Sequence, residues 1–340
     1  MFCINTEEAK DLIRNVAIEL NEPVMLWGAP GTAKSSIVAQ VTEELDGVLC
    51  DVRLGQYDSI DLRGIPNIDG RKTVWNVPAT LPFIGNDAFP DDCLITLFVD
   101  ELTGAVPAVQ GVAYQLINDR RVGEHELKPN VRVVAASNRD GDRGATNRMA
   151  MPLANRLIHA EVIPDVDVAC LYAQANGWPM EWVAFMQFRK PLLNTFDPSK
   201  PDKSFATQRT WEKAMKCYAS TTMPLRTKQI AMAGAVGDGP AAEFWGFVEV
   251  WQQLKDYMPR ILKEPETVEL PAEPSMCYAV TVAVSGQLNV KNASTLHKFL
   301  CRLSPEFTVL AWQLAVKRDQ ALFATKEFID FSKRFKVVFD

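Results

Sequence analysis

A glycine-rich segment that ends in a lysine and two serines carries the strongest chemical signal in the sequence. Its residues are Gly28, Ala29, Pro30, Gly31, Thr32, Ala33, Lys34, Ser35 and Ser36. A loop that binds phosphates needs glycines so that backbone N–H groups can surround the anion, a lysine for the β- and γ-phosphates, and a hydroxyl for Mg²⁺. Lys34 and Ser35 meet the last two needs, and Ala33, where glycine is usual, is expected to lead into the following helix without strain. The segment therefore predicts a nucleotide-phosphate site, the alternative being an ordinary strand–turn–helix capped by Ser35.

Two adjacent carboxylates follow the most apolar run of the chain. Residues 93–99 read Cys-Leu-Ile-Thr-Leu-Phe-Val, and Asp100 and Glu101 come next. A strand that ends there would place both carboxylates at the rim of the sheet, beside the glycine-rich segment. Asp100 would hold Mg²⁺ through water, and Glu101 would polarise the attacking water. Two solvated acids are the simpler interpretation of this pair alone, but its position after the glycine-rich segment favours the catalytic one.

Three polar residues further along the chain complete the predicted site. Asn138 ends a third apolar strand and can orient the attacking water, although asparagine is also typical of a turn. Arg156 could supply positive charge to a γ-phosphate in a neighbouring subunit. Arg209, near the start of a predicted helix, could close onto the nucleotide. Surface ion pairs are the simpler alternative for both arginines.

Apolar runs that alternate with helical stretches predict the elements that position these side chains. The expected buried strands are Val24–Trp27, Val48–Val52, Leu94–Val99, Val131–Ala136 and Leu157–Ile163. The expected helices cover residues 6–20, with Thr6 as N-cap, then Ser35–Leu45 and Pro107–Asn118. The alternation predicts an α/β fold with a mostly parallel, five-stranded sheet covered on both faces, which binds ligands at the carboxyl ends of its strands.

The pattern changes after Pro164, where apolar residues recur at helical spacing. The run Tyr278–Val284 is ambiguous between strand and helix, and the segments 190–204 and 263–274 are rich in proline and polar residues. We therefore expect three domains. They are a nucleotide-binding α/β domain over residues 1–163, a helical lid over 164–265 and a helical extension over 266–340.

The composition excludes several classes of protein. With 340 residues, 47% of them hydrophobic and 23% charged, the chain is neither disordered, collagen-like nor a disulfide scaffold. Seven scattered cysteines and three scattered histidines favour free thiols in a reducing, cytoplasmic compartment over a zinc site. Neither a signal peptide nor ~20 consecutive apolar residues occur, so we expect no membrane association. A net charge of -6 makes nucleic acid the less favoured partner.

In type and order these motifs resemble those of the AAA+ ATPases, and among them the MoxR-like branch. The resemblance rests on GAPGTAKS, the VDE strand end, the SN after the fourth strand, and the ANR and TQR segments. It implies a three-layer P-loop NTPase fold that uses ATP and Mg²⁺, with Ser35 and Asp100 as metal ligands. It also implies these roles: Walker A at Lys34 and Ser35, Walker B at Asp100 and Glu101, sensor 1 at Asn138, arginine finger at Arg156, and sensor 2 at Arg209. Arg143 and Arg148 compete with Arg156 for the finger.

Two predicted hairpins are similar to insertions of the same branch. Residues 62–78 contain Asp69-Gly70, a signal for a tight hairpin turn, and residues 119–130 read DRRVGEHELKPN. In related rings both hairpins face the central pore, where Trp75 and Ile65 would grip a substrate. The alternative is that Trp75 packs its own hairpin onto the sheet.

The resemblance implies an ATP-hydrolysing remodelling chaperone that acts on a protein client. It would work as a homo-oligomeric, hexameric ring, often with a partner that carries a von Willebrand factor A domain. An AAA+ motor that acts on nucleic acid is the alternative, and its hydrolysis would be stimulated by DNA with a steep salt dependence. A GTPase needs an N-K-x-D reader after a strand, and the nearest match is Ser199-Lys-Pro-Asp202 in a proline-flanked loop. Intact Lys34, Asp100 and Glu101 argue against a ring component that does not hydrolyse ATP.

Overall fold

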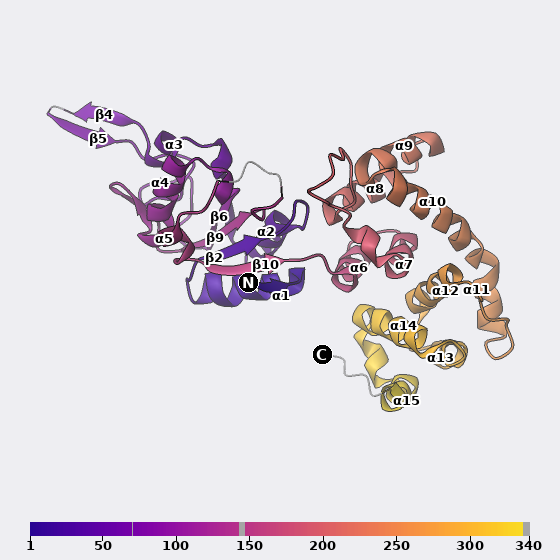
Figure 1. Cartoon of the computed structure of the whole chain (residues 1–340). Helices are drawn as coiled ribbons and strands as arrows, with labels where there is room; N and C mark the ends of the chain where they lie inside the picture. The colour runs from indigo at the N-terminus through magenta and orange to yellow at the C-terminus, as the bar shows by residue number, and fades with distance from the viewer. Residues whose placement is uncertain (70, 143–146, 336–340) are drawn as a thin grey trace. The chain divides into compact units, whose positions relative to one another are not determined.

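The computed structural model describes residues 1–69, 71–142 and 147–335. Contacts divide the chain into two compact units (Figure 1). The first comprises Met1–Pro164 with Phe196–Pro201, and the second comprises Asp165–Thr195 with the chain from Asp202 onward. Residues 266–340, expected as a separate extension, belong to the second unit.

The first unit is built on a sheet of six parallel strands in the order β1-β10-β2-β9-β6-β3. The strands are β1 (Phe2–Ile4), β2 (Val24–Trp27), β3 (Val48–Arg53), β6 (Ile95–Asp100), β9 (Val131–Ser137) and β10 (Ile158–Val162). The five predicted strands are present, so the mostly parallel α/β fold is confirmed. The predicted number of strands is wrong because β1 adds a sixth at the edge beside β10. Its three residues are too few to show a periodic pattern in the sequence.

Helices cover both faces of this sheet and give three layers. One face packs against α1 (Thr6–Leu12), the π-helical stretch Ile13–Glu19 and α2 (Lys34–Glu44); the other packs against α3 (Ser59–Arg63), α4 (Pro107–Asn118) and α5 (Met151–Ala154). Successive strand residues alternate between the two cores, as Leu26 and Met25 illustrate. The predicted N-cap Thr6 is wrong. Asn5 caps α1 and forms a capping box with Glu8, since its side chain can accept from the first free N–H groups.

Two short hairpins extend from the first unit. They are β4 (Pro66–Asp69) with β5 (Lys72–Trp75), and β7 (Arg121–Val122) with β8 (His125–Glu126). Figure 1 shows the β4–β5 hairpin projecting away from the sheet. Gly64 closes its base: a Cβ there would lie 1.9 Å from the Asn76 carbonyl oxygen, at a backbone φ of +90°. Only glycine fits this position without displacing the hairpin. Gly70, in the predicted turn, lies outside the described residues.

The described part of the second unit consists of helices around one core. They are α6 (Val166–Ala175), α7 (Met180–Phe188), α8 (Gln208–Ala219), α9 (Leu225–Val236), α10 (Asp238–Gln252), α11 (Leu254–Lys263), α12 (Pro274–Gln287), α13 (Ala293–Leu300), α14 (Pro305–Arg318) and α15 (Lys326–Phe335). The ambiguous run Tyr278–Val284 lies within α12. The buried tryptophans Trp182, Trp211 and Trp312 belong to one continuous core. Across the described residues, no helix has the length and apolar character needed to cross a membrane.

Candidate active site

The glycine-rich loop joins the carboxyl end of β2 to α2 and lies tightly against β10. A Cβ on Gly28 would come within 2.7 Å of the Val162 carbonyl oxygen and 2.9 Å of Thr32 Oγ1. Thr32 Oγ1 donates to the Ala29 carbonyl oxygen at 2.9 Å. Gly31 has a φ of +79°, in the left-handed region that glycine tolerates. The loop therefore has a compact shape that a side chain at either glycine would disturb.

Ala33 adopts a backbone conformation that the sequence did not predict. It is the N-cap of α2, with φ 65° and ψ 14°, and no side chain caps the helix there. The expectation that alanine enters the helix without strain is wrong, because a left-handed residue with a Cβ costs about 1–2 kcal/mol. Ser35 is likewise not the cap. The left-handed residue just before a helix directs successive N–H groups into one concavity, which suits an anion.

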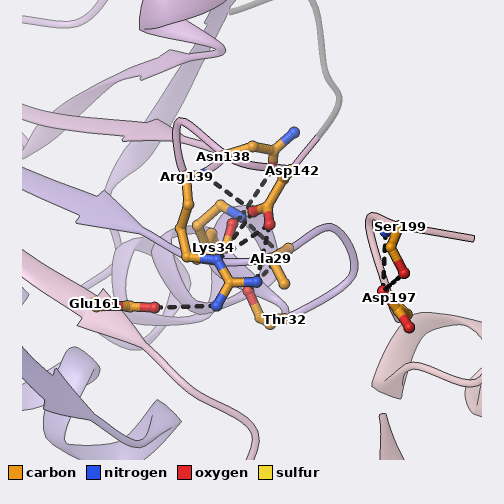
Figure 2. Close-up of polar contacts among 10 residues, drawn as sticks. Ala29, Thr32, Lys34, Asn138, Arg139, Asp142, Glu161, Asp197 and Ser199 are labelled. Atoms are coloured by element: carbon orange, nitrogen blue, oxygen red, sulfur yellow. Dashed lines mark hydrogen bonds and ion pairs between the residues drawn. The ribbon is translucent and has the colours of Figure 1, made fainter. Parts of the chain in front are cut away.

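Lys34 brings the loop and the fourth predicted strand together. Its Nζ donates to the carbonyl oxygens of Gly28 at 2.7 Å and Ala29 at 3.1 Å, and to Asn138 Oδ1 at 3.3 Å (Figure 2). The side chain is buried. An ammonium is attracted more strongly to an anionic phosphate oxygen than to a neutral carbonyl or amide oxygen, because the phosphate adds the attraction between opposite charges. A phosphate in this loop would therefore compete well with these neutral acceptors for the ammonium.

The hydroxyl and the first carboxylate predicted to hold a metal ion are in direct contact. Ser35 Oγ donates to Asp100 Oδ2 at 3.1 Å. Mg²⁺ prefers oxygen ligands and is usually held by one or two carboxylates together with substrate phosphates and water. The described residues contain no cluster of three or more His, Cys, Asp or Glu that would suit a fully protein-bound metal. The oxygen pair Ser35–Asp100 therefore fits a magnesium ion that shares its coordination with a nucleotide.

Glu101 is the second non-glycine residue of the site with a left-handed backbone. Its φ is 55° and its ψ 37°, and its backbone N–H donates to Asp100 Oδ1 at 2.9 Å. A Cβ on Gly55 would lie 3.1 Å from Glu101 Oε2. Backbone strain of this kind costs about 1–3 kcal/mol and is concentrated at functional sites. Ser36, also predicted to bind the nucleotide, is exposed in the first turn of α2.

A buried hydroxyl pair, which sequence reasoning missed, ties the two strand ends together. Ser137 Oγ lies 2.6 Å from Thr103 Oγ1 and accepts from the Thr103 backbone N–H at 3.0 Å. Both side chains are buried. Ser137 precedes Asn138, and Thr103 comes two residues after Glu101, so this pair sets the spacing between the two predicted catalytic side chains. The only signal in the sequence is their position next to those residues.

An ion-pair network holds the segment after Asn138 against β10, and it too was missed. The Arg139 guanidinium contacts Asp142 through Nη2 at 2.9 Å and Glu161 through Nη1 at 3.3 Å (Figure 2). The hydrogen bond that the guanidinium donates to the Asp142 carboxylate is the main reason why the pKa of Arg139 is raised. Asp142 is almost fully buried. The network joins the segment that carries Asn138 to the strand against which the glycine-rich loop packs.

The candidate arginine finger lies at the other end of the sheet. Arg156 is exposed and comes two residues before β10, whose Ile158 pairs with Val24 at the start of β2. The glycine-rich loop follows the opposite end of β2. Arg156 is therefore separated from the loop of its own chain by the length of the strand. Arg148 is also exposed, and Arg143 lies outside the described residues.

Arg209 belongs to the second unit. It is the second residue of α8, which begins with a capping box between Thr207 and Thr210. Its predicted role toward the nucleotide stays a prediction.

The hairpins place the two predicted substrate-gripping residues differently. The Arg63 guanidinium carbon lies 4.0 Å above the Trp75 ring, and the Trp75 backbone N–H donates to Glu124 Oε1 at 3.3 Å. Trp75 is thus half-buried between α3 and the second hairpin. Ile65 is 65% exposed and Ile68 is 80% exposed. These two isoleucines and Val74, which is 46% exposed, rather than Trp75, form the exposed apolar surface of the described part of the hairpin.

Comparison with known proteins finds a family model that matches part of the first unit. Residues 23–157 match the model of the AAA domain, dynein-related subfamily. Among solved structures, a RuvB mutant from Thermotoga maritima is similar over 87% of this chain and 87% of its own, with 15% identity and a TM-score of 0.37. NtrX from Brucella abortus is similar over 97% of this chain and 67% of its own, with 12% identity and a TM-score of 0.34. Structural similarity at this level has no bearing on function.

Proposed function

We propose that residues 23–157, which match the model of the AAA domain, act as an ATPase of the AAA+ type and hydrolyse ATP to ADP and phosphate. The observation that carries the proposal is the meeting of three chain segments at one edge of the sheet. Lys34 contacts Asn138, and Ser35 contacts Asp100. These are the groups that phosphoryl transfer requires for binding phosphates and positioning a nucleophile.

Each residue of the edge has a defined task in this reaction. The N–H groups of the glycine-rich loop surround the phosphates, and Lys34 binds their terminal oxygens. Ser35 and Asp100 would hold Mg²⁺, which supplies charge neutralisation when bound. Glu101 accepts a hydrogen bond from the attacking water and polarises it, and the Asn138 amide orients that water.

The test is to separate nucleotide binding from hydrolysis. We expect Lys34→Ala to abolish Mg²⁺-dependent ATP hydrolysis, because the terminal phosphates lose their cation. We expect Glu101→Gln to bind ATP but to turn over at least ~10²-fold more slowly, the scale for losing a positioned base. Lys216→Ala and Glu212→Gln, which change an exposed ion pair of α8, are matched controls. Hydrolysis by Lys34→Ala at the wild-type rate would refute the site.

We further propose a MoxR-like ring, hexameric in size, that remodels a protein client. Three observations support it: the order of the motifs, the net charge of -6, and the exposed Arg156 at the end of the sheet away from its own loop. An arginine that cannot reach its own nucleotide can serve a neighbour's, where such a group contributes ~10³-fold or more. A partner with a von Willebrand factor A domain is proposed from the family resemblance.

Mixing two inactive variants tests the ring. A Lys34→Ala subunit retains Arg156, and an Arg156→Ala subunit retains its phosphate loop, so mixed assemblies should recover partial hydrolysis. Fully active monomers would refute the ring. Glu101→Gln, used as bait in a pull-down with ATP, should retain the client. Stimulation of hydrolysis by DNA, with steep loss at higher salt, would instead indicate a nucleic-acid motor.

A further inference from the structure

A small cavity lies at the end of the sheet opposite the glycine-rich loop. Its volume is about 200 Å³, and its polar lining comes from Asn21, Glu22, Asn118, Arg120 and Arg156. Asn21 and Glu22 directly precede β2, Arg120 follows α4, and Arg156 precedes β10. The cavity therefore belongs to the edge where the strands start, and none of the groups assigned to hydrolysis within one chain line it.

The lining of this cavity is rich in donors and poor in compensating charge. Among residues 1–69, 71–142 and 147–335, neither Arg120 nor Arg156 forms an ion pair with a carboxylate. Glu22 is the one carboxylate in the lining, and Asp119 nearby is engaged by the Asn118 side-chain amide. Two guanidinium groups against one carboxylate leave a net positive cavity that favours an anion.

Arg120 is held in place by neutral acceptors. Its Nη1 donates to Asn21 Oδ1 at 3.3 Å, and its Nη2 donates to the carbonyl oxygens of Lys128 and Val131, both at 3.1 Å. A guanidinium has five N–H donors, so two of them remain for another acceptor. Burial and the nearby positive charge of Arg132 lower the pKa of Arg120, which means that its charge is under-compensated. A bound anion would place a negative charge beside this partly buried guanidinium and would offset the repulsion from Arg132.

Two residues of the same lining have a left-handed backbone, which is common for asparagine but unusual for arginine. Asn21 has a φ of 56° and Arg120 a φ of 53°, both in the left-handed region. For arginine this conformation costs about 1–2 kcal/mol. Strain that the surrounding structure maintains is concentrated at binding and catalytic sites.

We infer that this cavity is an oxyanion site that receives the terminal phosphate of ATP bound to a neighbouring copy of the chain, with Arg120 as a second cation beside Arg156. The inference rests on the proposed function, which makes Arg156 act on a neighbour. The planar guanidinium forks of Arg120 and Arg156 match phosphate oxygens. Asn21 and Asn118 add short polar side chains at the rim of the cavity.

The first arm of the test uses mixed assemblies. Arg156→Ala subunits are combined with Lys34→Ala subunits that also carry Arg120→Gln. We expect the recovered hydrolysis to be at least about tenfold lower than with Lys34→Ala alone, because a trans cation is lost. Arg121→Gln in the same subunit is the matched control: Arg121 also donates to a backbone carbonyl, that of Gly123, but does not line the cavity. If Lys34→Ala subunits recover the same hydrolysis with and without Arg120→Gln, the inference is overturned.

The second arm measures inorganic phosphate binding to the full Lys34→Ala chain by calorimetry, with the loop site disabled. Glu22 is exposed, so Glu22→Gln keeps the fold and should tighten phosphate binding about threefold by removing a repulsive charge. Arg120→Gln and Arg156→Gln should each weaken it at least about tenfold. Phosphate affinity that none of these variants changes would refute the oxyanion site.

The two arms separate this inference from the proposed function. In one outcome, the three variants change phosphate affinity as expected, but Arg156→Ala subunits mixed with Lys34→Ala subunits recover no hydrolysis. The proposed ring with a trans-acting arginine then fails. The oxyanion site then stands with free phosphate as its ligand, and the neighbour's ATP is excluded as the source. If recovery occurs and depends on Arg156 but not on Arg120, the ring stands and the second cation is refuted.

Discussion

The loss of the buried hydroxyl pair Ser137–Thr103 should lower both the local stability of the first unit and its rate of hydrolysis. Ser137→Ala removes the acceptor of the Thr103 backbone N–H, at 3.0 Å, and the partner of its hydroxyl, at 2.6 Å. Both residues are buried, so water does not replace the lost partner. Each buried polar group left unpaired costs about 1–3 kcal/mol, so we expect a loss of about 3 kcal/mol in the free energy of unfolding.

Thr103→Val is the informative contrast, because it leaves Ser137 Oγ as the acceptor of the backbone N–H. We expect it to cost about 1 kcal/mol, one hydrogen bond. The difference of about 2 kcal/mol corresponds to about 30-fold in an opening equilibrium. Hydrogen exchange in peptides from β6 and β9 measures this difference inside the first unit, without interference from unfolding of the second. Equal protection in the two variants, or the reverse order, would refute the reasoning.

Hydrolysis should fall together with this local stability. Ser137 and Thr103 set the spacing between Asn138 and Glu101, and a small misplacement of catalytic groups can lower kcat by about tenfold or more. Thr96→Val is the matched control, since it removes the buried Thr42–Thr96 hydroxyl contact of 2.9 Å near the start of β6. It should lower the free energy of unfolding by a similar amount, about 1 kcal/mol, and leave kcat unchanged. A loss of kcat in this control equal to that in Ser137→Ala would show that the effect is merely one of stability.

Three further predictions concern two backbone positions and one half-buried imidazole. Ala33→Gly should raise the stability of the first unit by about 0.5–1 kcal/mol, since relief of left-handed strain exceeds the entropy that glycine adds to the unfolded chain; a lower melting temperature would contradict this. Gly64→Ala should accelerate hydrogen exchange in β4 and β5 while ATP binding is unchanged, because its Cβ would lie 1.9 Å from the Asn76 carbonyl oxygen; unaltered exchange would count against the close approach. Burial lowers the pKa of His297 below its ordinary value of 6.5, so its stabilising contribution is complete above pH 6.5 and is lost as pH falls through the lower folded value. Urea unfolding of the second unit between pH 7.5 and 5 should show this loss, and His297→Gln should flatten it.

The sequence by itself predicted the elements that carry the residues of the candidate site. Strand β2, the glycine-rich loop and α2 are consecutive in the chain, so their local pattern is enough to predict them. The ends of β6 and β9 could be placed beside the loop because parallel strands bring their carboxyl ends to one edge. The contacts Lys34–Asn138 and Ser35–Asp100 follow this prediction.

Only the tertiary structure decided the features that depend on contacts between distant segments. The left-handed conformation of Ala33 lies at the turn from the loop into α2, where the helix propensity of alanine does not predict it. Strand β1 exists because β10 offers it an edge, not because three residues form a strand alone. The cavity around Arg120 joins the residues before β2, the end of α4 and the residue before β10. Long-range packing brings Arg120 to its three neutral acceptors. Contacts of this kind leave no periodic signal in the chain.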